Sequence, residues 1–116
     1  MRLVIKRVYD KPTKSDGYRV LVDRMWPRGV KKEDAHIDEW VKDIAPPKDL
    51  VAWYHEDKEK RFQEFSKKYK AYLKDQSDLI EKFTTEHKVL TLVTAVKDIE
   101  HSHIPTLKRV WNKSLN

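Results

Sequence analysis

The stretch VLVDRMWPRG, Val20–Gly29, decides how the rest of the chain is interpreted. It opens with three consecutive aliphatic residues, which is typical of a strand covered on both faces in a parallel sheet. It ends with a proline and a glycine, which interrupt regular structure and fix a turn. We therefore predict a buried strand over residues 18–22 and a loop at its carboxyl end, where open α/β sheets bind their ligands.

The polar side chains of this loop favour an anionic ligand. Arg24 and Arg28 bracket the turn, and a guanidinium offers a planar fork of donors that suits phosphate, sulfate or carboxylate. Trp26 offers a flat face for stacking, and Asp23 is placed to orient an arginine. Together with Gly29, these residues are our predicted ligand-binding set. In the structural alternative, Asp23 pairs with Arg24 and Trp26 closes the edge of the core.

Length, charge and cysteine content limit the class of protein. With 116 residues the chain predicts a single α/β domain over residues 1–116. The absence of cysteine excludes disulfides and thiolate chemistry. The formal charge of +6 favours anionic partners, although many lysines alternate with glutamates, as on a solvated helix surface.

The hydropathy pattern predicts a cytoplasmic protein without membrane contact. No apolar run approaches the roughly 20 residues that cross a bilayer. The amino-terminal residues MRLVIKR alternate too strongly for a signal peptide. The sequence does not define an oligomeric state.

The remaining pattern predicts alternating strands and helices. We expect strands at 2–8 and 88–96, the second one central in the sheet, and a helical turn at 31–36. Residues 37–44 fit a short edge strand, and Pro47 is placed to open a helix. Aromatic residues at steps of three and four predict a helix over 58–74. Ser77 is placed to cap another helix, and Pro105 predicts that the last helix starts near Ser102. The expected fold is α/β, with three to four mostly parallel strands and about four helices.

A second group of ionisable residues follows the strand at 88–96. If this strand is a parallel neighbour of the one at 18–22, both following loops share one rim of the sheet. His101 has a reference pKa near neutrality, so we predict His101, Glu100 and Asp98 as catalytic acid–base groups. Lys97 and His55 are predicted to bind ligand at the same place.

Two other interpretations of this second loop stay open. His101 and His103, with Asp98 or Glu100, could bind a metal ion, although we predict neither a metal nor a cofactor. Alternatively, the acids only complement the dipole at the start of the last helix.

The string DRMWPRG, Asp23–Gly29, resembles the signature of the YeaO-like branch of the uncharacterised domain-of-unknown-function 488 family. The likeness extends to residues along nearly the whole chain, among them Asp38, Trp53 and His101. The resemblance implies a small cytoplasmic α/β domain and no established activity. More distant relatives carry cysteine near their last strand, where this chain has Ala95.

We therefore expect a pocket for a small anion such as a phosphate, nucleotide or carboxylate. The sequence leaves open whether the protein is an enzyme; an acid–base hydrolase or transferase is the most concrete version. The alternatives are a nucleic-acid-binding module and a non-catalytic interaction domain. The sequence contains no recognised nucleic-acid-binding motif.

Overall fold

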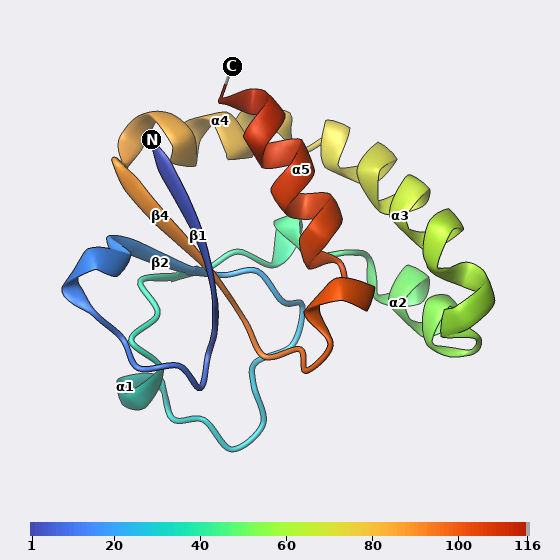
Figure 1. Ribbon diagram of the computed structural model, residues 1–116, viewed down its shortest axis with the longest axis horizontal. Helices are drawn as coiled ribbons and strands as arrows, with labels where there is room; N and C mark the ends of the chain where they lie inside the picture. Colours follow the sequence, from blue (N-terminus) through green and yellow to red (C-terminus); the bar gives the residue numbers. More distant parts are fainter. Residues whose placement is uncertain (116) are drawn as a thin grey trace.

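Four parallel strands form the centre of the molecule in the computed structural model, which describes residues 1–115 (Figure 1). They are β1 (Arg2–Arg7), β2 (Tyr18–Leu21), β3 (Glu39–Trp40) and β4 (Val89–Thr94). The order across the sheet is β1-β4-β2-β3. Residues Arg2–Arg7 pair with Val89–Thr94, while Tyr18–Leu21 pair with Leu90–Val93. The last strand in sequence is thus central, as expected from its apolar composition.

The longer helices cover one face of the sheet. They are α2 (Lys48–His55), α3 (Lys58–Lys74), α4 (Ser77–Glu86) and α5 (Ile104–Ser114), and Figure 1 shows them along the upper and right sides. The short α1 (Lys32–Ala35) lies at the lower left. Three 3₁₀ turns occupy Lys14–Asp16, Lys42–Ile44 and Ile99–His101.

Side chains divide between the two faces with the period of two expected of strands. Leu90 and Leu92 join the main core beneath the helices. Val93 packs on the other face with Val8 and Ala35. The aromatic stripe of α3 faces the core, where Phe65 and Tyr69 are buried together with Leu73. Both faces of the central strand β4 are therefore covered, which accounts for its largely apolar sequence, VLTLVT.

The predicted fold class is confirmed, and two helix starts differ from the sequence-based expectation. Gln76 takes the cap position of α4, and Ser77 is its first helical residue. Helix α5 begins at Ile104 because residues 99–101 first form a separate turn that Asp98 caps. The hydroxyl of Ser102 nevertheless accepts from the Ile104 N–H at 3.1 Å, so it still serves the start of α5.

Candidate ligand-binding site

The loops that follow β2 and β4 leave the sheet toward opposite faces. The chain after β2 leads to α1, which packs on the Val93 side, whereas the chain after β4 leads to α5 in the main helical layer. Since β2 and β4 are neighbours, their carboxyl ends form a topological switch point, the usual position of a ligand crevice. Figure 1 shows the two loops emerging near one another below the sheet.

A cavity of about 640 Å³ lies at this switch point, and both predicted loops line it. We call it the switch-point cavity. Eight of the ten residues predicted from sequence are in its lining: Asp23, Arg24, Trp26, Arg28, His55, Lys97, Asp98 and His101. The structure also supplies an apolar wall: Met25, Val51, Tyr54, Phe65 and Val96. The two loops thus meet, as their sequence suggested they would if the strands were neighbours.

Three cationic side chains at this cavity are solvent-exposed. They are Arg28, Lys58 and Lys97. No hydrogen bond or ion pair holds any of their charged groups among residues 1–115. Their charges are therefore available to an anion that enters the cavity.

Arg24 has a different role from Arg28. Its Nε donates to the Pro46 carbonyl at 2.9 Å, and its terminal nitrogen donates to the Ala45 carbonyl at 3.0 Å. The side chain therefore ties the loop after β2 to the segment before α2. Arg24 still lines the cavity, but two of its donors serve the fold.

Asp23 does not pair with either arginine of its loop in the part of the chain that the structure describes. Its carboxylate accepts from the Thr94 hydroxyl at 2.7 Å and from the Ala95 N–H at 2.8 Å. His103 Nε2 lies 3.3 Å from Asp23 Oδ1 and donates to the Val22 carbonyl at 3.0 Å. The carboxylate therefore joins the ends of β2 and β4 at the base of the cavity.

Two tryptophans stabilise the loop after β2. The indole N–H of Trp26 donates to the Val30 carbonyl and that of Trp40 to the Asp23 carbonyl, both at 2.7 Å. Their rings meet edge to face with centroids 5.5 Å apart. Trp26 therefore helps to shape the loop and also offers its surface to the cavity.

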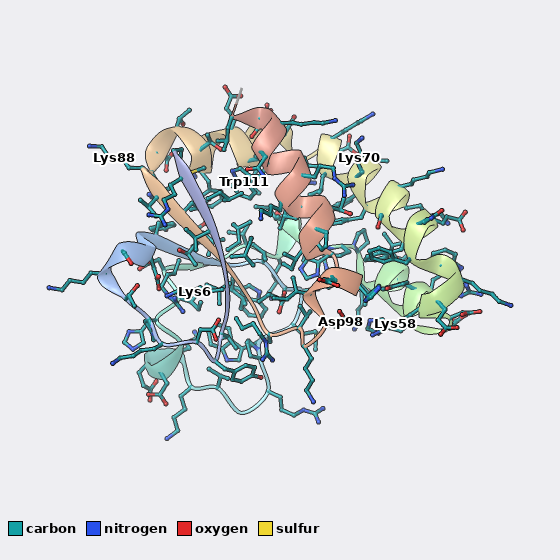
Figure 2. All side chains as sticks on the ribbon, viewed as in Figure 1. Lys6, Lys58, Lys70, Lys88, Asp98 and Trp111 are labelled. Atoms are coloured by element: carbon teal, nitrogen blue, oxygen red, sulfur yellow. The ribbon has the colours of Figure 1, made fainter. Side chains whose placement is uncertain are left out.

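Asp98 and His101 form an exposed pair at the mouth of the cavity. Asp98 Oδ2 lies 2.8 Å from His101 Nδ1, and this hydrogen bond lowers the pKa of the Asp98 carboxyl. The buried Tyr54 hydroxyl donates to the His101 carbonyl at 2.7 Å and holds the turn in place. Figure 2 shows Asp98 and Lys58 close together beneath α5 and α3. Both also line a neighbouring cavity of about 540 Å³.

Two predicted residues do not line either cavity. Glu100 is exposed, because adjacent residues of a 3₁₀ turn point in directions about 120° apart, and its neighbour His101 is the one that faces Asp98. Gly29 is exposed with a φ of 77°, and its contribution is the turn itself. His55 does line the cavity, where partial desolvation and Lys58 lower its pKa.

The metal-binding alternative requires the rings of His101 and His103 to approach one another. In the structure the two rings contact different residues. His101 contacts Asp98, whereas His103 contacts Val22 and Asp23. Within residues 1–115, no three histidine, aspartate or glutamate side chains are grouped as a metal ion needs. None of the helices described has the length and hydropathy of a membrane span.

The site residues that sequence reasoning missed are His103, Tyr54 and Lys58. The sequence indicates His103 only as a possible metal ligand and does not single out Tyr54 or Lys58. The cavity brings His103 together with these two residues, which come from a distant segment of the chain. Nothing in the local sequence identifies their shared position.

Comparisons with other proteins indicate a family. A sequence model of DUF488-N3i, described as the inactive DUF488-N3 subclade, matches residues 2–116. The uncharacterised protein Rv3073c of Mycobacterium tuberculosis is 42% identical over 112 residues, which cover 96% of this chain and 94% of that protein. The uncharacterised protein YeaO of Escherichia coli is 54% identical over 55 residues, covering 47% of this chain and 48% of that protein. No solved structure matches the chain.

Proposed function

The chain belongs to the DUF488-N3i family, the inactive DUF488-N3 subclade, and from this premise we propose that it binds a small anionic compound in the switch-point cavity. The observation that carries the proposal is the charge of the cavity lining. Four lysine or arginine side chains line it, namely Arg24, Arg28, Lys58 and Lys97, against the carboxylates of Asp23 and Asp98. The ligand class is a phosphate, nucleotide or carboxylate.

The apolar wall supports a ligand with a carbon body in addition to its acid group. Trp26, Tyr54 and Phe65 give the cavity aromatic surface, and Met25 is 69% exposed at its edge. Small-molecule sites commonly combine such surface with a few charged groups that orient the ligand. A nucleotide or an organic phosphate fits this combination better than a bare inorganic ion.

The chemistry of the hydroxyl groups favours binding over covalent catalysis. The chain has no cysteine. The Thr94 hydroxyl donates to Asp23, and the Ser102 hydroxyl donates to the Ile99 carbonyl at 2.7 Å. Of the two, only Thr94 faces a base, and this Asp23 carboxylate also accepts from the Ala95 N–H and joins the ends of β2 and β4, so we assign it a structural role. The word "inactive" in the family's description agrees with this interpretation.

The second candidate is acid–base catalysis by Asp98 and His101, which their 2.8 Å contact favours. Asp98 would hold the Nδ1 proton and leave Nε2 of His101 as the base for a water molecule. Hydrolysis of a bound phosphate ester that His101→Ala abolishes, without loss of binding, would support this candidate.

Thermal shift against a panel of phosphates, nucleotides, carboxylates and divalent metals tests the proposal. We expect a selective rise in Tm with one anion class, lost in Arg28→Ala and kept in Arg109→Ala, an exposed arginine on α5. A panel without response would contradict the proposal. Binding to generic oligonucleotides with steep salt dependence would instead support the nucleic-acid alternative.

A further inference from the structure

Three cations of the switch-point cavity are more exposed than two of its other polar side chains. The cations Arg28, Lys58 and Lys97 are exposed at its mouth. By contrast, the side chain of Asp23 is only 13% exposed and that of His103 only 8%. These cations therefore lie at the mouth, together with the exposed pair Asp98–His101, whereas Asp23 and His103 are among the least exposed polar groups of the lining.

The hydrogen bond of His103 defines which nitrogen carries its proton. Nε2 lies 3.0 Å from the Val22 carbonyl, which can only accept, so Nε2 must donate. In the neutral imidazole, Nδ1 then carries a lone pair. No hydrogen bond to Nδ1 occurs among the described residues. With a neutral ring, His103 thus offers Nδ1 as an acceptor at the cavity lining, in a tautomer set by the backbone.

Asp23 adds a second acceptor at the same depth. Its two oxygens accept one short hydrogen bond each, from Thr94 and Ala95. A carboxylate has about four lone-pair positions, so it retains capacity for a ligand donor. An acid group placed beside Asp23 would be repelled, whereas a hydroxyl or ammonium group would be stabilised there.

We propose that the switch-point cavity selects an anion that carries a hydrogen-bond donor, a hydroxyl or ammonium group, at the end remote from its acid group. The donor lies on Nδ1 of His103 and the carboxylate of Asp23. The acid group lies at the mouth beside Arg28 and Lys97. This inference rests on the proposed anion-binding function and specifies its ligand class.

A matched pair of probes tests the polarity of the site. Glycerol 3-phosphate carries two hydroxyls that propyl phosphate lacks, on a body of the same length. Calorimetric titration of the wild-type chain should show that glycerol 3-phosphate binds about two- to tenfold more tightly than propyl phosphate. This ratio corresponds to one or two net hydrogen bonds.

Two variants separate the donor contact from the anion contact. In His103→Gln, the amide nitrogen keeps a donor for Val22, while the Nδ1 acceptor is replaced by an amide oxygen at a different position. We expect the preference for glycerol 3-phosphate over propyl phosphate to decrease without vanishing, because the Asp23 carboxylate remains, and the propyl phosphate affinity to stay unchanged. Arg28→Ala should weaken both compounds by the same factor. Equal binding of both probes to wild type, weakened by Arg28→Ala, would overturn the donor inference and leave the proposed function intact. Failure of both probes to bind would overturn the donor inference for phosphates, and a panel of anions without response would contradict the proposed function as well.

A measurement on the wild-type chain covers the case in which His103→Gln does not fold. Long-range ¹⁵N–¹H correlation spectra report the tautomer of each histidine. We expect protonated Nε2 on His103 and a Nδ1 resonance that moves with glycerol 3-phosphate but not with propyl phosphate. A proton on Nδ1 in the free protein, or equal shifts with both compounds, would overturn the inference.

Discussion

Asp16 and Arg19 form a buried ion pair, 2.6 Å between carboxylate and guanidinium, at the amino end of β2. Lys6 reaches the other carboxylate oxygen at 2.7 Å. The remaining donors of Arg19 bind the carbonyls of His36 and Ala35. This cluster therefore joins β1 and β2 to the loop that carries α1.

Asp16→Asn should destabilise the protein by about 3 kcal/mol, because the Arg19 guanidinium stays buried without the carboxylate that neutralises it. Burial alone raises the pKa of the Asp16 carboxyl, but hydrogen bonds from Lys6, Thr13 and Arg19 outweigh it and hold the pKa well below its usual value. The folded state therefore binds this proton less readily than the unfolded chain does. The stabilisation is complete above about pH 4 and decreases as the pH falls further.

Urea unfolding between pH 7 and pH 2 measures both effects. The wild-type free energy of unfolding should fall below about pH 4, and Asp16→Asn should flatten that decrease. Asp78→Asn, which changes an exposed residue of α4, is the control. An unchanged acid profile in Asp16→Asn would show that other carboxyls dominate acid unfolding.

Arg24→Ala and Arg28→Ala should differ in their effect on the free energy of unfolding. Arg24 donates to two backbone carbonyls, so its loss should cost about 2 kcal/mol of stability. Arg28 makes no such contact among residues 1–115 and is exposed, so its loss should change stability by less than about 0.5 kcal/mol. Chemical denaturation of both variants checks this difference. Unfolding of Arg28→Ala would instead favour the structural interpretation of the loop.

The two glycines with positive φ should differ in their tolerance of alanine. At Gly17, with a φ of 63°, a Cβ would lie 2.4 Å from the Val89 carbonyl oxygen, which β4 holds in place. At Gly29, with a φ of 77°, a Cβ would meet nothing within 4 Å. We expect Gly17→Ala to lose about 3 kcal/mol or more and Gly29→Ala about 1 kcal/mol. Equal losses in thermal unfolding would contradict this.

Tyr54→Phe should loosen the turn that presents His101. It removes the hydrogen bond to the His101 carbonyl, and the expected cost is about 1 kcal/mol. Burial, with a smaller effect of Asp98, raises the pKa of Tyr54, so its hydroxyl donates over the whole neutral range. Amide hydrogen exchange at residues 99–101 should accelerate in Tyr54→Phe and not in Tyr9→Phe, whose ring is 58% exposed. Unchanged exchange would assign the turn's stability to Asp98 alone.

Periodicity in the sequence predicted the elements that bury a continuous apolar face. Helix α3 spans Lys58–Lys74 as expected, and β4 is central as its composition indicated. The pairing of β2 with β4 confirms the condition on which the shared rim depended. These features follow from local patterns that tertiary contacts reinforce.

The roles of individual polar side chains could not be predicted, because they depend on distant backbone groups. Arg24 and Arg28 belong to the same loop, yet among residues 1–115 only Arg24 donates to carbonyls, those of Ala45 and Pro46. His103 contacts a carbonyl 81 residues away. Asp16 lies in a polar segment between β1 and β2, and it is buried by partners in these two strands.

The central position of β4 also determines when the protein can fold during its synthesis. Strand β1 pairs only with β4, and β2 has otherwise only the two-residue partner β3. At typical translation rates, β1 waits on the order of ten seconds before its neighbour emerges from the ribosome. The edges of β1 and β2 therefore stay unpaired with β4 throughout this interval, and unpaired strand edges favour aggregation.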